Sequence, residues 1–152
     1  MNIVYLSDHI EFAETVATWS FNEWVKGIRA GVTYEDVLAS VKKCAKTKLP
    51  VRILAMIDGR CVGAAALFEN DLKGKTYTPW LAAVYVDAQY RNQKIGRQLI
   101  ERIKEISIEL GYKELFLRTE HASGYYKKLG WSYVESCVDE YGVKPDVFKI
   151  QL

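Results

Sequence analysis

Basic side chains crowd the start of a predicted amphipathic helix, where positive charge is unfavourable. Arg91, Lys94 and Arg97 lie at its first turn with no acidic neighbour, whereas Glu105 and Glu109 lie toward its end. The helix macrodipole and the free N–H groups of the first turn favour anions at the start and cations at the end. The reversed arrangement indicates that a ligand supplies the anion, and phosphate is a group that helix starts commonly bind.

Hydrophobic patterns give the elements that position this turn. Residues 80–86 form a continuous apolar run, as expected of a strand buried on both faces. The helix that follows repeats apolar residues at intervals of three and four, and Gly111 supplies its C-cap. Residues 114–119 predict a strand that returns through a strand–helix–strand crossover, which makes it parallel to residues 80–86.

Further elements are predicted on both sides of this unit. The Asp58–Gly59 pair between two apolar runs predicts a β-hairpin. The order of elements predicts a single α/β (α+β) domain over residues 1–152, with a mixed central sheet of about six to seven strands and helices on both faces. The other expected elements are a strand over 2–6, helices over about 10–25 and from Thr33, strands over 51–57 and 61–68, a polar loop over 69–79, a short helix over 122–129, and strands over about 131–140 and 146–152.

Composition argues against several classes of protein. The 152 residues are 49% apolar and 26% charged, as in ordinary globular proteins. The net charge of +2 is too small to indicate a nucleic-acid partner, and no apolar run approaches the ~20 residues of a membrane span. Three cysteines without metal-ligand spacing favour a reduced, cytoplasmic protein with no metal site.

Two motifs resemble those of a known family. The segment Arg91-x-x-Lys94-x-Gly96, between an apolar strand and a long helix, resembles motif A of the GNAT N-acetyltransferase superfamily, which has the form Gln/Arg-x-x-Gly-x-Gly/Ala. Downstream, the run from Tyr125 to Trp131 resembles the family signature aromatic-Tyr-x-x-x-Gly-aromatic. Because both motifs occur in order with the expected elements between them, the resemblance covers essentially the whole chain.

The resemblance implies a binding site for acetyl-CoA as cosubstrate, without a metal, where the central sheet splays apart. Backbone N–H groups of the turn and helix start would bind the pyrophosphate. The end of the preceding strand would bind the pantetheine arm as if it were an added strand. The implied cofactor-binding residues are Val84, Tyr85, Val86, Arg91, Asn92, Gln93, Lys94, Ile95, Gly96, Arg97 and Thr119.

Three positions depart from the family pattern. Lys94 replaces the first Gly of the motif, which costs ~1 kcal/mol or more only in a left-handed backbone conformation. Ala88 replaces a frequent Pro at the junction of strand and loop. Thr119 stands where many relatives carry an Asn that contacts the cofactor. Since Lys94 and Ala88 both keep their backbone N–H, phosphate binding is expected to persist.

Catalysis is expected to involve a tyrosine and an acidic residue. Tyr126 matches the position that protonates the departing thiolate in many family members; its alternatives are a packed aromatic or a cofactor contact without proton transfer. The acceptor amine must lose a proton before it attacks. The candidates for its base are Glu69, Asp71 and Glu120, of which Glu69 is preferred because the family often draws acidic groups from strands that flank the acceptor cleft. No cysteine has a His nearby in sequence, so covalent catalysis is not expected.

Aromatic residues offer candidate walls for the acceptor site. Trp24, with Trp19 and Phe21, is either helix core or a substrate contact, and the same alternatives hold for Trp80, which follows Pro79. We therefore take Trp24, Trp80 and Glu120 as the candidate substrate residues.

The sequence thus predicts direct acetyl transfer from acetyl-CoA to a primary amine of a small molecule, of aminoglycoside, polyamine or amino-acid type. Two alternatives remain open: a protein or peptide N-terminal or lysine acetyltransferase, and a catalytically silent acetyl-CoA-binding sensor. Neither nucleic acid nor a membrane is expected as a partner, whereas the dimers common in the family leave a homodimer open.

Overall fold

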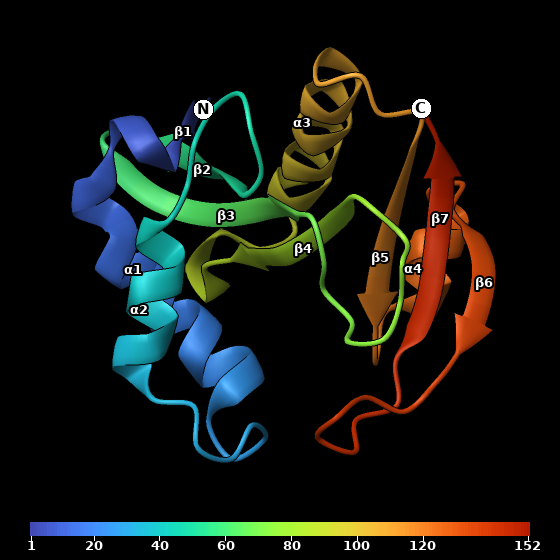
Figure 1. Cartoon of the computed structure of the whole chain (residues 1–152). Helices are drawn as coiled ribbons and strands as arrows, with labels where there is room; N and C mark the ends of the chain where they lie inside the picture. Colours follow the sequence, from blue (N-terminus) through green and yellow to red (C-terminus); the bar gives the residue numbers. More distant parts are fainter.

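The computed structural model describes residues 1–152 and contains one seven-stranded mixed sheet with helices on both faces (Figure 1). The elements are β1 (Asn2–Tyr5), η1 (Leu6–Asp8), η2 (Ile10–Phe12), α1 (Ala13–Ser20), η3 (Phe21–Val25), α2 (Tyr34–Lys42), β2 (Val51–Ile57), β3 (Arg60–Phe68), β4 (Trp80–Val86), η4 (Ala88–Tyr90), α3 (Ile95–Glu109), β5 (Glu114–Thr119), α4 (Ser123–Lys128), β6 (Ser132–Ser136) and β7 (Asp146–Gln151). The strand order is β1-β2-β3-β4-β5-β7-β6, in which β4 and β5 are parallel and the other neighbours antiparallel. The predicted fold class is confirmed.

Alternation along β2 divides the apolar core between the two faces of the sheet. Ile53 packs with the apolar stripe of α3, whereas Leu54 packs with α1 and with Val41 of α2. In Figure 1, α1 and α2 accordingly lie side by side, away from α3. Gly63 lets β3 approach α3 closely, because a Cβ there would lie 3.2 Å from Leu99 Cδ1.

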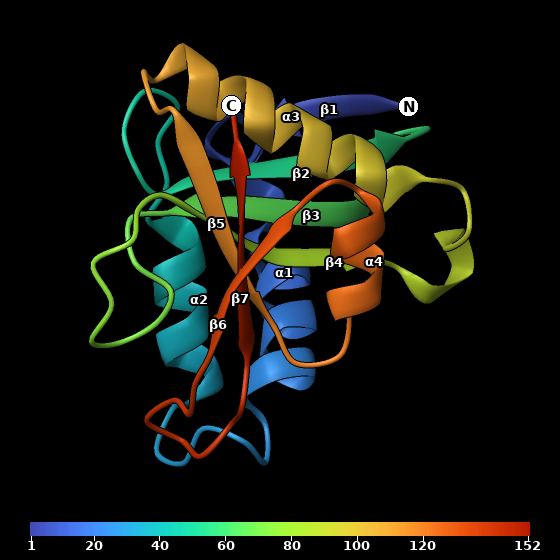
Figure 2. The same cartoon turned by 90° about the vertical axis from the view of Figure 1, so that its right-hand side faces the viewer.

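The sheet divides into two halves between β4 and β5. The only Cα register pair that joins these strands is Trp80–Phe116. Beyond it the two strands diverge, and the rest of β4 pairs with β3 alone. Figure 2 shows β5, β7 and β6 running steeply across the direction of β1–β4. The splayed sheet implied by the family resemblance is therefore present.

The first helical region differs from the continuous helix expected over residues 10–25. It consists of a 3-10 turn, the α-helix α1 and the π-helical turn η3. Single π-turns inside helices occur frequently at functional sites. Here the π-turn carries Trp24, which reaches the pocket described below.

The other boundaries follow local chemistry. A capping box between Thr33 and Asp36 starts α2, as predicted. The strand β6 ends earlier than expected because the chain turns at Asp139, whose carboxylate accepts hydrogen bonds from the backbone amides of Tyr141 and Val143 at 2.8 and 2.9 Å. None of the helices is both long and apolar enough to cross a membrane.

Candidate active site

The start of α3 leaves backbone amides free to bind an anion. Gln98 N donates to the carbonyl of Lys94 at 3.1 Å, the first bond of the helix. The amides of Ile95, Gly96 and Arg97 precede this bond and have no helical acceptor. No side chain caps the helix, and no acidic residue lies in its first turn. Together with the helix dipole, these donors suit a phosphate group.

Two residues of the preceding turn adopt a left-handed backbone conformation without being glycine. Lys94 has φ 62° and Asn92 has φ 64°. The strained case considered for Lys94 is therefore the one observed. Gly96, by contrast, has room for a side chain, since an added Cβ would lie at an ordinary 3.7 Å from Val86 Cγ2. The protein itself does not require glycine there, so the absent side chain favours close approach by a ligand.

The basic side chains of the turn differ in their surroundings. Arg91 Nε donates to the carbonyl of Val86 at 3.0 Å, and its guanidinium lies 5.4 Å from the centre of the Tyr85 ring. Arg91 thus braces the turn against β4. Lys94 and Arg97 are exposed beside the free amides at the start of α3, where they can contact a phosphate bound to those amides.

A β-bulge sets the orientation of the end of β4. The register with β3 shifts between Ala64 and Ala66, and opposite this shift Ala83 adopts φ 52°. The extra residue reverses the alternation along the strand, so that Tyr85 faces α1 and stacks on Trp19 with ring centres 5.2 Å apart. The edge of residues 84–86 that faces β5 remains without a strand partner, as binding of an extended ligand would require.

A pocket of about 450 Å³ opens where β4 and β5 diverge. Its walls come from η3 and α2, from parts of β2, β3, β4 and β5, from the segments that follow β3 and β5, and from α4. Apolar residues make up about half of the wall. The charged side chains in it are Glu23, Arg29, Asp36, Arg52, Asp71, Arg118 and Glu120.

Tyr126 reaches this pocket from α4. Its ring meets Trp131 edge to face, with ring centres 5.9 Å apart. Burial, and to a lesser degree the adjacent Tyr125, raises the pKa of the Tyr126 phenol to about 12. The hydroxyl is consequently protonated at neutral pH and available as a hydrogen-bond donor.

Among the three candidate bases, Asp71 has the environment that suits proton transfer. It lies in the loop after β3, where its backbone carbonyl accepts a hydrogen bond from Arg118 Nη1 at 3.5 Å. Burial raises the pKa of its carboxyl to about 7, although Arg118 and Arg29 oppose the rise. A group with this pKa exchanges a proton readily at neutral pH. Glu69 is exposed and does not line the pocket.

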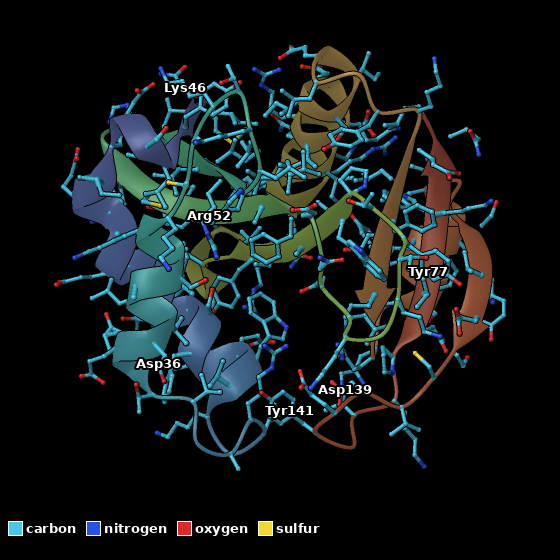
Figure 3. All side chains as sticks on the ribbon, in the orientation of Figure 1. Asp36, Lys46, Arg52, Tyr77, Asp139 and Tyr141 are labelled. Atoms are coloured by element: carbon cyan, nitrogen blue, oxygen red, sulfur yellow. The ribbon has the colours of Figure 1, made fainter.

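Glu120 lines the pocket as part of an ion-pair network. Arg118 Nη2 donates to Glu120 Oε1 at 2.9 Å and to Asp139 Oδ2 at 2.8 Å. Although burial alone would raise the pKa of Asp139, the Arg118 guanidinium and backbone donors hold it below its usual range. Both carboxylates are therefore occupied by Arg118. Figure 3 shows Asp139 and Tyr141 at the lower end of the space between the two halves of the molecule.

The two aromatic candidates, Trp24 and Trp80, differ in whether they reach the pocket. Trp24 lines the pocket and meets Tyr85 edge to face. Trp80 is 0% exposed, donates its indole N–H to the carbonyl of Tyr77 at 2.6 Å and packs against Phe116. The structure therefore removes Trp80 from the candidate substrate contacts, because its burial at the strand junction leaves no surface for a ligand.

Thr119 has two roles in the site. It lines the pocket, and its hydroxyl accepts a hydrogen bond from the amide of Ala122 at 3.0 Å at the start of α4. It thus helps to position the helix that carries Tyr126.

Arg52 was not among the residues predicted for the site. It is the single charged residue in the apolar run of β2, and that interruption was the available signal. Side-chain alternation places Arg52 on the α2 face with Leu54, and it reaches the pocket wall. Figure 3 shows it near the centre of the molecule.

No group of three or more His, Cys, Asp or Glu side chains is arranged to hold a metal ion. The three cysteines are unpaired. Burial raises the pKa of the Cys61 thiol to about 11, which makes this cysteine a poor nucleophile.

Comparison with known proteins agrees with this arrangement. Residues 14–131 match the acetyltransferase (GNAT) family. No curated protein matches the sequence. The chain belongs to the GNAT family and is an acetyltransferase.

Solved structures share the fold at low sequence identity. An aminoglycoside 6'-N-acetyltransferase complexed with coenzyme A superimposes with a TM-score of 0.77 at 15% identity, over 99% of this chain and 97% of that one. The protein yncA of Salmonella typhimurium, with its cofactor acetyl-CoA, gives 0.72 at 17% identity, over 100% and 94%. A ribosomal-protein-alanine N-acetyltransferase of Brucella melitensis gives 0.75 at 15% identity, over 100% of both chains.

Proposed function

We propose that this chain transfers the acetyl group of acetyl-CoA directly to a primary amine of a small molecule. The observation that carries the proposal is the pocket at the divergence of β4 and β5, which contains Tyr126 and Asp71 together. A thioester that enters along the free edge of β4 would meet there an amine that enters from the side of α2.

The features at the start of α3 support binding of acetyl-CoA. The free amides of Ile95, Gly96 and Arg97 would receive the diphosphate, and the side chains of Lys94 and Arg97 would add charge. The unpaired edge of residues 84–86 would hydrogen-bond the pantetheine arm. The solved structures that bind CoA and acetyl-CoA share this fold.

Asp71 would act on the acceptor amine, and Tyr126 would act on the departing sulfur. Asp71, rather than Glu69, would take a proton from the acceptor ammonium, because a pKa of about 7 keeps much of it ionised at neutral pH. The amine nitrogen then forms a bond to the acetyl carbon while the bond from that carbon to sulfur breaks. Of the two protons that the ammonium loses, one ends on the CoA thiol and one is released.

The pKa of about 12 defines the part that Tyr126 plays. Full transfer of its proton to a thiolate with a pKa of about 8.5 is uphill by roughly 5 kcal/mol. We therefore infer that Tyr126 donates a hydrogen bond to the sulfur as its charge develops, and that the thiolate takes its proton from solvent or from the acceptor.

The shape of the pocket supports a small acceptor. Arg29, which follows η3, lies 5.6 Å from the centre of the Tyr141 ring in the loop between β6 and β7, so the two halves of the molecule meet beside the pocket. An extended peptide would have to displace this contact. The aminoglycoside enzymes among the structures with this fold agree with a small acceptor.

The test is the loss of thioester absorbance from acetyl-CoA with polyamines, aminoglycosides, amino acids and short peptides. Ultraviolet detection avoids the protein's own cysteines. Turnover with a small amine supports the proposal, whereas turnover with peptides alone would indicate the peptide or protein alternative. Stabilisation by acetyl-CoA without turnover on any acceptor would indicate the sensor.

A further inference from the structure

Arg52 carries a positive charge into the pocket wall with no protein partner. It is only 6% exposed, and its Nε is buried without a hydrogen-bond acceptor. No ion pair of the structure includes Arg52. Its guanidinium instead lies 4.9 Å from the centre of the Phe68 ring. Burial of a cation without an anionic partner costs free energy unless a ligand supplies the anion.

The acidic groups near Arg52 do not neutralise it. Burial raises the pKa of the Cys44 thiol, so Cys44 is uncharged at neutral pH. Asp36 accepts a hydrogen bond from the backbone amide of Thr33 at the start of α2, and Glu120 is paired with Arg118. Glu23 is exposed and forms no ion pair with Arg52. The charges of Asp71 and Arg52 attract each other at a distance, but the two side chains form no ion pair. Two cations of the pocket wall form no ion pair, Arg29 and Arg52. Arg29 is partly exposed and lies over the Tyr141 ring, so Arg52 is the one that is buried without an anion.

We propose that Arg52 binds a carboxylate of the acceptor, which makes the acceptor an amino acid or a related amino carboxylate. This inference rests on the proposed function and names its substrate class. The planar guanidinium matches a carboxylate through paired hydrogen bonds, and its position over the Phe68 ring helps to hold it in the pocket wall.

An acidic side chain of the same pocket fits the ammonium group of such a substrate. Asp71 lines the same cavity and is the group that would take the proton of the ammonium. A zwitterion presents an ammonium and a carboxylate together, so it satisfies both side chains at once. A polyamine or an aminoglycoside has no anionic group for Arg52 and would place its own positive charges beside it, which is unfavourable.

The experiment compares free L-amino acids with their α-carboxamides as acceptors of the acetyl group. The amide keeps the amine and the side chain but loses the charge. We expect kcat/KM to be about 10- to 100-fold higher for the acids, the usual scale of a charge-assisted hydrogen bond. In Arg52→Gln, kcat/KM for the acids and for the amides should be about equal. The matched control Arg29→Gln removes an equal charge from another part of the wall and should keep the preference.

The outcomes separate the two proposals. Equal or better turnover of amides than of acids, or an unchanged preference in Arg52→Gln, overturns the carboxylate site and leaves the acetyltransferase proposal standing. If Arg29→Gln abolishes the preference equally, the pocket attracts anions only through its general charge, and the assignment to Arg52 is overturned. Turnover of no amine at all contradicts the proposed function, and this inference falls with it.

A second readout distinguishes a binding residue from a structural one. Because Arg52 is buried without a partner, Arg52→Met should leave the thermal unfolding midpoint unchanged or raise it. A midpoint clearly below that of the unaltered protein would identify Arg52 as a structural residue and overturn the assignment.

Discussion

Trp80 of β4 and Phe116 of β5 form the single register pair that joins the two halves of the sheet, and their rings lie 6.0 Å apart. Tyr77 stacks on Phe116 at 5.0 Å and completes an aromatic cluster at the point of divergence. This cluster holds the strands together on one side of the junction, while the pocket opens on the other. The separation of β4 and β5 thus depends on side chains that do not touch the ligand site.

The position of Trp80 predicts that it acts on stability rather than on substrate binding. Trp80→Ala should lower the free energy of unfolding by about 3–5 kcal/mol, the usual cost of truncating a buried tryptophan, as measured by urea denaturation. Trp24→Ala should cost less stability and raise KM for the acceptor, because Trp24 lines the pocket. A changed acceptor KM in a stably folded Trp80→Phe variant would contradict this account.

Tyr126→Phe should lower the rate of acetyl transfer by roughly 10- to 1,000-fold and leave the affinity for acetyl-CoA nearly unchanged. The physical reason is loss of the hydroxyl that stabilises the departing sulfur. The adjacent Tyr125 is 45% exposed and does not line the pocket, so Tyr125→Phe is the matched control. If the two variants have equal rates, Tyr126 has no part in the chemistry.

Asp71→Asn should slow acetyl transfer by about 100- to 10,000-fold. In the unaltered protein kcat/KM should rise with pH through a midpoint near 7, the pKa of Asp71, and this acid limb should vanish in the variant. The control variant Glu69→Gln should keep both the rate of acetyl transfer and the fall in kcat/KM toward acidic pH. The opposite result would assign the base to Glu69.

The same carboxyl predicts how stability depends on pH. Because its folded-state pKa is raised from 3.8 to about 7, the folded protein binds this proton more tightly than the unfolded chain. The associated stability is present below pH 4 and is lost as pH rises through 7. Asp71→Asn should therefore stabilise the protein most at pH 8 and progressively less toward pH 4, in thermal unfolding followed across this range.

The left-handed turn before α3 predicts opposite effects on stability and binding. Lys94→Gly should stabilise the fold by about 1 kcal/mol because it relieves the strain at φ 62°. It should also weaken acetyl-CoA binding at low salt, since one charge near the diphosphate is lost. The control Lys94→Arg keeps both the charge and the left-handed conformation at φ 62°, and it should leave the affinity and the stability nearly unchanged. Equal affinities in both variants would exclude Lys94 from phosphate binding.

Local sequence signals predicted most of the fold, including the helix start at which we propose that acetyl-CoA binds. The apolar run of β4, the Asp58–Gly59 hairpin and the start of α2 after Thr33 are short-range patterns, and the structure retains each of them. The amides at the start of α3 are free because the first turn of a helix offers them no acceptor, and the sequence places no acidic residue there to compete with a bound anion.

The acceptor half depends on contacts between distant segments, which sequence spacing does not encode. Glu69 and Asp71 are two residues apart in one loop, yet only Asp71 turns into the pocket. For both Trp24 and Trp80 the sequence left open a core position or a substrate contact, and only the pairing of β4 with β5 decides that Trp80 is buried. The lack of a partner for Arg52 depends on the packing of α2 and the β3 loop around it.

A crystal structure of the complex with CoA would show directly where each part of the cofactor binds. We expect the diphosphate at the amides of Ile95, Gly96 and Arg97, the pantetheine arm along residues 84–86, and the sulfur in the pocket beside the Tyr126 hydroxyl. A diphosphate bound instead in the shallow groove along α3, near Arg102, or a sulfur outside the pocket, would contradict this expectation.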